Sequence, residues 1–279
     1  MLPILYGLTS ALTWGAADFT GGIASKRTNV YGVVIGAEGF GMVLSIALAL
    51  AFRESLPPLQ TWLWGSAAGL SGGFGLLLLY RALSSGRMSV AAPVSAVIAA
   101  IIPVVFGAFL DGLPGVWTFA GILLALGSVW LIAHSEGGSE NATIRLNEIT
   151  LPLIAGVVFG MYFVFMHQAS REAIFWPIVA ARLASTAGIL GFALVTRQPW
   201  KPESKNWPLI ALSGTLDASG NAFFVLGSQI GRLDVSAVLG SLYPGSTVLL
   251  AALFLHERLS RLQLAGILAA LTAIVLMML

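Results

Sequence analysis

The heptapeptide AGILLAL at residues 120–126 occurs a second time, with one letter changed, as AGILAAL at residues 265–271. The two stretches stand 145 positions apart (265 − 120), about half the length of the 279-residue chain. The same offset pairs Trp14-Gly15 with Phe159-Gly160, Gly69 with Gly214, Gly75 with Gly220, Gly86-Arg87 with Gly231-Arg232 and Phe109-Leu110 with Phe254-Leu255. Because one constant offset holds from residue 14 to beyond residue 120, the sequence indicates an internal repeat.

The composition places the chain in a lipid bilayer. Hydrophobic residues make up 57% of the sequence and charged residues 9%, and the mean hydropathy is +0.91. Soluble domains carry about 25% charged residues, so a soluble fold of this size could not bury so much apolar surface. The few scattered charges exclude a basic patch for nucleic acid. The sequence has no cysteine, which excludes disulfides, thiolate metal sites and cysteine nucleophiles.

Ten apolar runs approach the length of about 20 residues that a spanning helix needs. We expect helices at residues 3–24, 31–52, 60–80, 88–110, 116–133, 148–168, 174–196, 207–229, 233–255 and 261–279. The first run lacks the basic n-region of a signal peptide and is expected to be retained. The longest polar stretch, HSEGGSENATIRLNE at residues 134–148, lies near mid-chain. The predicted fold class is an all-α membrane protein with ten transmembrane helices in two five-helix repeats, residues 1–138 and 139–279.

Five helices are an odd number, so the second unit must enter the membrane in the opposite orientation to the first. Cytoplasmic loops collect Lys and Arg. In the first unit the loops after helices one, three and five hold Lys26, Arg27, Arg81, Arg87 and Arg145, and the others hold only Arg53. In the second unit the loops after helices seven and nine hold Arg197, Lys201, Lys205, Arg258 and Arg261, and the others hold only Arg171 and Arg232. This pattern predicts an inverted repeat with both termini outside the cytoplasm.

Three stretches of the sequence resemble the EamA-type repeat of the drug/metabolite transporter superfamily. They are TWGAADF at residues 13–19, GRLDVSAVLGSLYP at residues 231–244 and FLHERLSRLQLAGILAAL at residues 254–271. The resemblance covers the chain in two copies and implies alternating access around a central cavity lined by both halves, without ATP. In size and organisation the chain is also similar to bacterial inner-membrane exporters of amino acids, including the YddG-like exporters of aromatic amino acids.

The two copies depart from one another in ways that affect the cavity. Glu257 in the second copy has Gly112 at its repeat position, with Asp111 just before it, and Pro244 falls on Ala99. The two halves of the cavity therefore need not be chemically equal. The break that Tyr243-Pro244 introduces into the ninth helix also matters, because proline removes a backbone hydrogen bond and broken helices often mark binding sites in transporters.

Four ionisable residues lie within predicted spans, where a charge is costly and usually faces a cavity or a partner. They are Asp18, Glu38, Arg182 and Asp217, and Asn221 shares a helix face with Asp217. The repeat offset maps Glu38 to Leu183, so Glu38 and Arg182 stand at nearly equivalent depths and could pair across the repeat axis. Arg182 could instead meet a substrate carboxylate, and each charge could also simply reach the membrane surface.

Asp18 and Asp217 are the candidates to hold a proton or the ammonium group of a substrate. For Asp18 the alternative is a side chain that reaches lipid headgroups, and for Asp217 a structural hydrogen bond with Asn221. Trp14, with Tyr80 and Tyr243, could form an aromatic wall for the solute, although plain packing is the more frequent role of such residues. The predicted substrate-binding set is Trp14, Asp18, Glu38, Tyr80, Arg182, Asp217, Asn221 and Tyr243.

These patterns favour a secondary transporter, and the resemblance implies an exporter of amino acids that is a multi-pass protein of the cell inner membrane. No nucleotide, metalloprotease or hydrolase motif occurs, so we expect no catalytic residue, metal or cofactor. The expected partners are a small-molecule substrate, the lipid bilayer and protons, and a monomer suffices because one chain holds both orientations. Efflux of cationic drugs, nucleosides or sugars is the first alternative. A lipid-modifying membrane enzyme is the second, although His134, His167 and His256 are scattered in the sequence.

Overall fold

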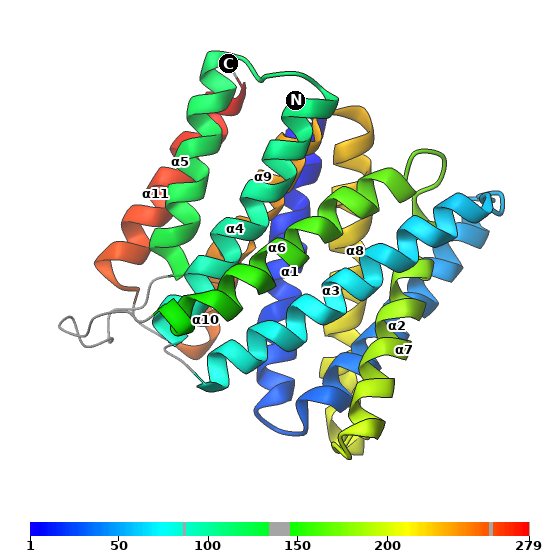
Figure 1. Ribbon diagram of the computed structural model, residues 1–279. Coiled ribbons are helices and arrows are strands. Elements are labelled where there is room, and N and C mark those ends of the chain that lie inside the picture. Colours follow the sequence, from blue (N-terminus) through cyan, green and yellow to red (C-terminus); the bar gives the residue numbers. More distant parts are fainter. Residues whose placement is uncertain (86–87, 134–145, 257–258, 279) are drawn as a thin grey trace.

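The computed structural model describes residues 1–85, 88–133, 146–256 and 259–278, and these residues are mostly helical (Figure 1). The helices are α1 (Leu2–Ser25), α2 (Val30–Ala51), α3 (Leu59–Ser85), α4 (Met88–Leu110), α5 (Val116–Ala133), α6 (Leu146–Ala169), α7 (Phe175–Val195), the 3-10 turn η1 (Ser204–Asn206), α8 (Trp207–Ile230), α9 (Leu233–Gly240), α10 (Tyr243–Leu255) and α11 (Arg261–Met278). With α9 and α10 counted as one broken span, the predicted ten helices are confirmed.

The ninth span is divided where the sequence predicted an interruption. Helix α9 ends at Gly240, and α10 begins at Tyr243 with Pro244 in its first turn. The proline ring fixes its own backbone angle and offers no N–H group, which suits the start of a helix and not its interior. The chain therefore turns at residues 241–242 and starts a new helix.

The hydropathy of the individual helices is uneven. Six described segments are long and apolar enough to cross a membrane by length and composition alone, and the shorter apolar segments Val94–Leu110 and Val116–Ile132 accompany them. Helix α1 is not one of these six apolar segments. It carries Asp18 and several hydroxyl groups, and one of these, Ser10 Oγ, donates to the Gly220 carbonyl of α8 at 2.9 Å. The polar content of α1 is thus used partly in contacts between helices.

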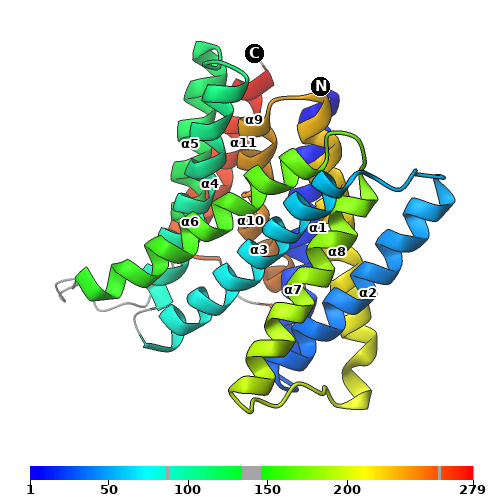
Figure 2. The same ribbon diagram turned by 45° about the vertical axis from the view of Figure 1, so that its right-hand side comes forward.

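Several contacts between two helices recur between the two helices that are their repeat equivalents. Helix α1 lies along α8, and its counterpart α6 lies along α3; in the same way α2 packs on α8 and α7 on α3. Helix α4 packs on α6, while α1 packs on α9 and α10. The self-equivalent pairs α2 with α7 and α5 with α11 flank this arrangement on opposite sides (Figure 2). This reciprocal pattern is that of two inverted five-helix repeats.

Glycines at repeat-equivalent positions make equivalent contacts. A Cβ atom at Gly69 would lie within 3.0 Å of the Ala181 carbonyl oxygen in α7, and one at Gly214 equally close to the Ala37 carbonyl oxygen in α2. Such close approach of backbones drives helix association in lipid. Further reciprocal contacts join Gly75 to Phe159 and Gly220 to Trp14, and join Gly121 to α11 and Gly266 to α5. The 145-residue offset is therefore expressed in the packing.

The second helix of each repeat ends with the same backbone motif. Arg53 after α2 and Arg197 after α7 both take left-handed backbone angles, with φ of 51° and 55°. In each case the following N–H group bonds back to a carbonyl in the last turn, Glu54 to Ala49 and Gln198 to Ala193, both at 2.8 Å. This is the geometry of a helix C-terminus closed by a left-handed residue.

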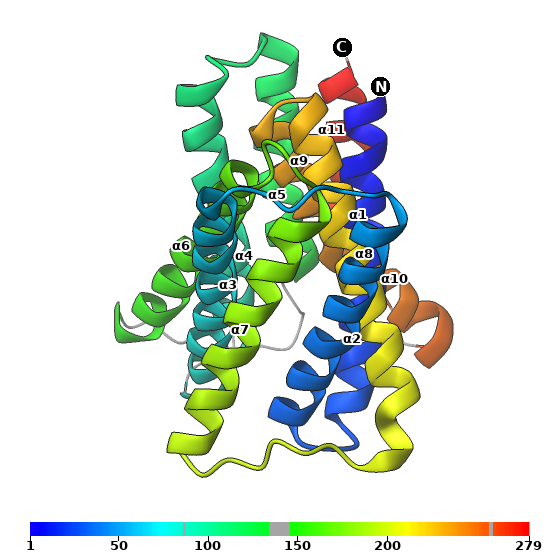
Figure 3. The ribbon, with the colours of Figure 1, turned by 90° about the vertical axis from the view of Figure 1, so that its right-hand side faces the viewer.

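The two ends of the bundle can be named by what they hold. Both chain termini lie at one end (Figure 1), which we call the termini end. The turn between α1 and α2 lies at the opposite end, which we call the linker end after this short connection. Asn29 Nδ2 donates to the Lys201 carbonyl at 2.7 Å, and the Glu203 N–H donates to Thr28 Oγ1 at 3.1 Å. Figure 3 shows the α7–α8 connection running along the end that holds the α1–α2 turn. Two of the lysine- and arginine-rich loops therefore share one end, as the charge pattern predicts.

Candidate functional site

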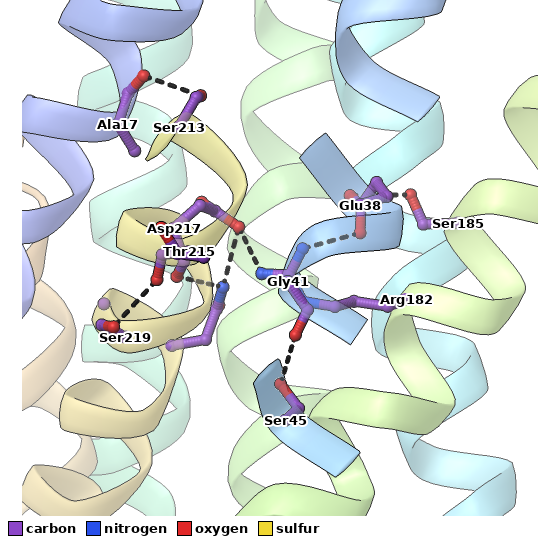
Figure 4. Close-up of polar contacts among 12 residues, drawn as sticks. Ala17, Glu38, Gly41, Ser45, Arg182, Ser185, Ser213, Thr215, Asp217 and Ser219 are labelled. Atoms are coloured by element: carbon purple, nitrogen blue, oxygen red, sulfur yellow. Dashed lines mark hydrogen bonds and ion pairs between the residues drawn. The ribbon is translucent and has the colours of Figure 1, made fainter. Parts of the chain in front are cut away.

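A buried guanidinium lies between helices α2, α7 and α8. The Arg182 side chain on α7 is 4% exposed, and its Nη1 lies 3.0 Å from Glu38 Oε2 on α2. Its Nη2 lies 2.6 Å from Asp217 Oδ2 on α8, so the arginine bridges two carboxylates from different helices (Figure 4). A charge taken out of water is tolerated only with close, hydrogen-bonded partners. The predicted pairing of Glu38 with Arg182 is present, and Asp217 is a second partner.

Glycine makes room for this arrangement. A Cβ atom at Gly41, one helical turn after Glu38, would lie 2.5 Å from both Cζ and Nη1 of Arg182 and 2.8 Å from the Gly214 carbonyl oxygen. Any larger residue at position 41 would displace the guanidinium. The same close approach of α2 to α8 that the scaffold needs therefore also brings Glu38 and Asp217 within reach of one arginine.

Neutral polar side chains extend the cluster to α6. Ser185 Oγ donates to Glu38 Oε1 at 3.4 Å. Asn221 Nδ2 donates to the Asp217 carbonyl at 2.8 Å and to Asp217 Oδ2 at 3.1 Å. The Tyr162 hydroxyl on α6 donates to Asn221 Oδ1. A continuous chain of polar contacts thus links α2, α7, α8 and α6, and both halves of the molecule contribute to it.

Asp18 is placed differently from the other three charges. Ile4, Ala11 and Asp18 are spaced by seven residues, which puts them on one face of α1. Ile4 and Ala11 are buried at 7% and 5% exposure, yet Asp18 is exposed. The same face is therefore buried toward the termini end and exposed at Asp18. Asp18 interacts electrostatically with Asp217, and no salt bridge to it occurs within the described ranges.

The aromatic candidates lie beside this cluster. The Trp14 ring is 9% exposed and packs edge-on against Phe163 and at a tilt against Phe224, with centroid distances of 5.9 and 6.0 Å. Tyr243 packs against the hydrophobic cluster that contains these three rings, and it interacts electrostatically with Asp18. Trp14 is thus a packing residue in this conformation. The side chain of Tyr80 lies outside the described residues.

Comparison with known proteins settles the family. The sequence model of the EamA-like transporter family matches residues 1–134 and again residues 146–279. The chain belongs to this family. Among curated proteins, the EamA-like chain is similar to the uncharacterized transporter sll1319 of Synechocystis sp. strain PCC 6803, with 26% identity over 157 residues. That match covers 54% of the chain and 46% of the relative, so the chain spans about half the length of the curated protein that it matches.

A solved structure supports the fold of the EamA-like chain independently. A protein crystal structure superimposes with a TM-score of 0.76 at 21% sequence identity, covering 98% of this chain and 95% of the other. At that identity the likeness concerns the fold alone. Together with the family match, the apolar helices make the chain a multi-pass membrane protein with the EamA fold.

The fold of this EamA-like chain brings five of the eight sequence-predicted residues into one region, namely Asp18, Glu38, Arg182, Asp217 and Asn221. Sequence reasoning missed Tyr162 and Ser185. Tyr162 immediately precedes Phe163, the repeat counterpart of Asp18, so a systematic look at counterparts of the charged residues would have pointed to it. Ser185 lies one helical turn after Arg182, which is the spacing of neighbours on a helix face.

The donor set of the EamA-like chain does not resemble a metal centre. Across residues 1–85, 88–133, 146–256 and 259–278, no group of three or more His, Cys, Asp or Glu side chains gathers closely enough to hold a metal ion. The site offers carboxylates that are held in place by their neighbours and that can bind and exchange a positive charge.

Proposed function

We propose that the chain is a secondary transporter that moves small solutes carrying an ammonium group across the cell inner membrane by alternating access, with amino acids, the aromatic ones included, as the exported substrates. The family supports transport. The inverted repeat supports alternating access, because exchanging the conformations of two inverted halves moves the opening from one side of the membrane to the other.

The observation that carries the substrate class is the balance of charge at the centre. Two carboxylates, on Glu38 and Asp217, pair with one guanidinium, on Arg182, and a third carboxylate, on Asp18, interacts electrostatically with Asp217. Both Nη atoms of the arginine are engaged by carboxylates of the protein, so its charge is already compensated. The remaining negative charge favours a cationic group, and Asp18 is the exposed carboxylate that can receive it.

The same residue suits proton coupling. An unpaired carboxylate in a membrane interior is stabilised either by a proton or by a cation. If the proton and the solute ammonium group compete for Asp18, a proton gradient drives the solute in the opposite direction. The half-exposed Asp217 side chain, at 41%, is the second carboxylate near this position.

Efflux of organic cations is the second candidate function. It is favoured by the exposure of Asp18 and by the absence of a salt bridge to it in the part of the chain that the structure describes. Amino acids need a further group to receive the carboxylate, whereas organic cations do not. The two candidates therefore differ in whether neutralising the substrate carboxylate, as in an amino acid amide, weakens transport.

The test is counterflow in liposomes loaded with labelled amino acids, amino acid amides, nucleosides, sugars and cationic dyes, with and without a pH gradient. We expect exchange of amino acids that the pH gradient accelerates, and loss of that exchange in Asp18→Asn. Glu172→Gln, an exposed loop carboxylate, is the matched control and should exchange normally. Wild-type rates in Asp18→Asn would contradict the role given to Asp18, and exchange of sugars alone would contradict the substrate class.

Asp217→Asn separates binding from folding at the same site. Glu38 still pairs with Arg182 in this variant, so the protein should insert and fold. Because the carboxylate that interacts electrostatically with Asp18 is gone, counterflow should be abolished. Normal efflux by folded Asp217→Asn would show that the second carboxylate is structural.

A further inference from the structure

A clasp at the termini end joins the two repeats. The Arg232 clasp consists of Arg232 and Asp234 from the second repeat and of Asp111 and Gly112 from the first. Arg232 Nη1 donates to the Asp111 carbonyl at 3.1 Å, and Nη2 donates to the Gly112 carbonyl at 2.5 Å. In return, the Leu233 N–H donates to Asp111 Oδ2 at 3.2 Å. The α8–α9 turn is thus held directly on the α4–α5 turn.

The clasp is fixed from within by a fully buried carboxylate. Asp234 is 0% exposed, and Arg232 Nε donates to its Oδ1 at 3.0 Å while Nη2 approaches its Oδ2 at 2.8 Å. The hydrogen bond to Asp234 raises the pKa of the Arg232 guanidinium above its ordinary value. An arginine guanidinium can donate hydrogen bonds to a carboxylate and two carbonyl groups at once because its donors are planar and rigidly oriented. Asp234 therefore orients Arg232 toward the other repeat.

The layer beneath the clasp is closed. Every residue of α9 is buried, and a Cβ at Gly107 would lie 2.9 Å from Asp234 Cβ, so α4 and α9 leave no room between them. On the outer side, a pocket of about 430 Å³ is lined by residues that include Glu54, His167 and Gln229. Gln229 Nε2 donates to the Ser170 carbonyl in the α6–α7 turn. Asp18, nearer the linker end, is exposed, whereas every residue of α9 at this end is buried.

We propose that Arg232 is the gate residue of the termini end, which holds the solute pathway shut there while the site is open to the linker end. The inference rests on the proposed function. Alternating access moves the two repeats relative to one another, so a contact that bridges them at the closed end must break when that end opens. Arg232 contacts neither Asp18 nor the Arg182 cluster, so we expect its substitution to change which end is open.

The absence of cysteine from the sequence makes the gate directly testable. Ser236→Cys is a nearly isosteric probe in the buried α9, and Gly22→Cys has open space for its side chain, four residues after Asp18 on the face of α1 open to the linker end. Each probe is combined with Arg232→Ala in proteoliposomes and labelled with a membrane-impermeant maleimide from each side. Removing several charge-assisted hydrogen bonds should shift the population of the two states about tenfold.

We expect Arg232→Ala to speed labelling of Ser236→Cys from the termini side about tenfold and to slow labelling of Gly22→Cys from the linker side. Arg171→Ala, which removes an exposed arginine at the same end, should change neither rate. Arg232→Lys keeps the charge but not the planar set of donors, and it should give an intermediate effect. It serves as the test if the alanine variant does not fold.

Unchanged rates at both probes in the folded variants would overturn the gate. The expected changes in labelling together with absent counterflow in the wild type would count against the proposed function alone.

Discussion

The two repeats share a scaffold but not a chemistry. Gly69 and Gly214 make the same close contact with the opposite repeat, as do Gly75 and Gly220. The counterparts of the charged residues are different: Asp18 corresponds to Phe163, Glu38 to Leu183, Arg182 to Ala37 and Asp217 to Gly72. The positions that fix backbone distances are duplicated, whereas the positions that carry charge are used once.

This difference separates two demands on the molecule. Two conformations that open to opposite sides require halves that pack interchangeably, because each half must adopt the shape that the other gives up. Binding one solute requires a single set of charges, because a duplicated set would bury further charges at high cost in lipid. The packing is therefore symmetric while the site is not.

Arg182→Ala should break the asymmetric site with the largest effect. It leaves Glu38 and Asp217 facing one another without a cation, and losing one partner of a buried ion pair costs about 3–5 kcal/mol. We expect a strongly lowered midpoint of thermal unfolding in detergent and no counterflow.

The control for this variant neutralises the whole cluster. Arg182→Met combined with Glu38→Gln and Asp217→Asn removes the uncompensated charge and should recover most of the stability without recovering transport. If Arg182→Ala alone were as stable as the wild type, the bridging role of the arginine would have to be abandoned.

Gly69→Ala and Gly214→Ala test the shared scaffold and should have intermediate, matching effects. Each methyl group would press on a backbone carbonyl of the other repeat, and overpacking of this kind costs about 1–3 kcal/mol. Thermal unfolding of the two variants should shift by similar amounts.

Gly39→Ala is the matched control, since a Cβ there meets nothing within 4 Å. It should leave stability unchanged or raise it by up to about 1 kcal/mol through helix propensity. A large difference between the variants at positions 69 and 214 would show that the two repeats are not packed alike.

Tyr162→Phe probes the edge of the site and should have the smallest effect. It removes the hydroxyl that donates to Asn221, and one such hydrogen bond contributes about 1 kcal/mol. Counterflow should persist at a reduced rate, because Asp217 keeps its contact with Arg182. Tyr31→Phe, on a ring that stacks against Phe192, is the control. Complete loss of transport in Tyr162→Phe would place this tyrosine in the binding step.

Several elements of this structure follow from local sequence. The ends of nearly all spans lie within a few residues of the apolar runs, because helix length in lipid is set by the thickness of the hydrocarbon. The repeat offset also placed Glu38 near Arg182, since equivalent positions of two inverted helices share a depth. Asp217 was predicted to hold a proton or a substrate ammonium group, with a hydrogen bond to Asn221 as the alternative. Its ion pair with Arg182 was not foreseen because nothing local fixes the rotation of α8 against α7.

The sequence by itself determined the membrane as solvent, the ten spans, the inverted repeat and the break before Tyr243. Each of these depends on hydropathy, charge or backbone chemistry within a short window. Only the tertiary structure decided that Arg182 bridges two carboxylates, that Asp18 stands apart from them and that Arg232 joins the repeats. Those contacts depend on how helices distant in sequence rotate and approach one another, which is set by close packing across the whole bundle.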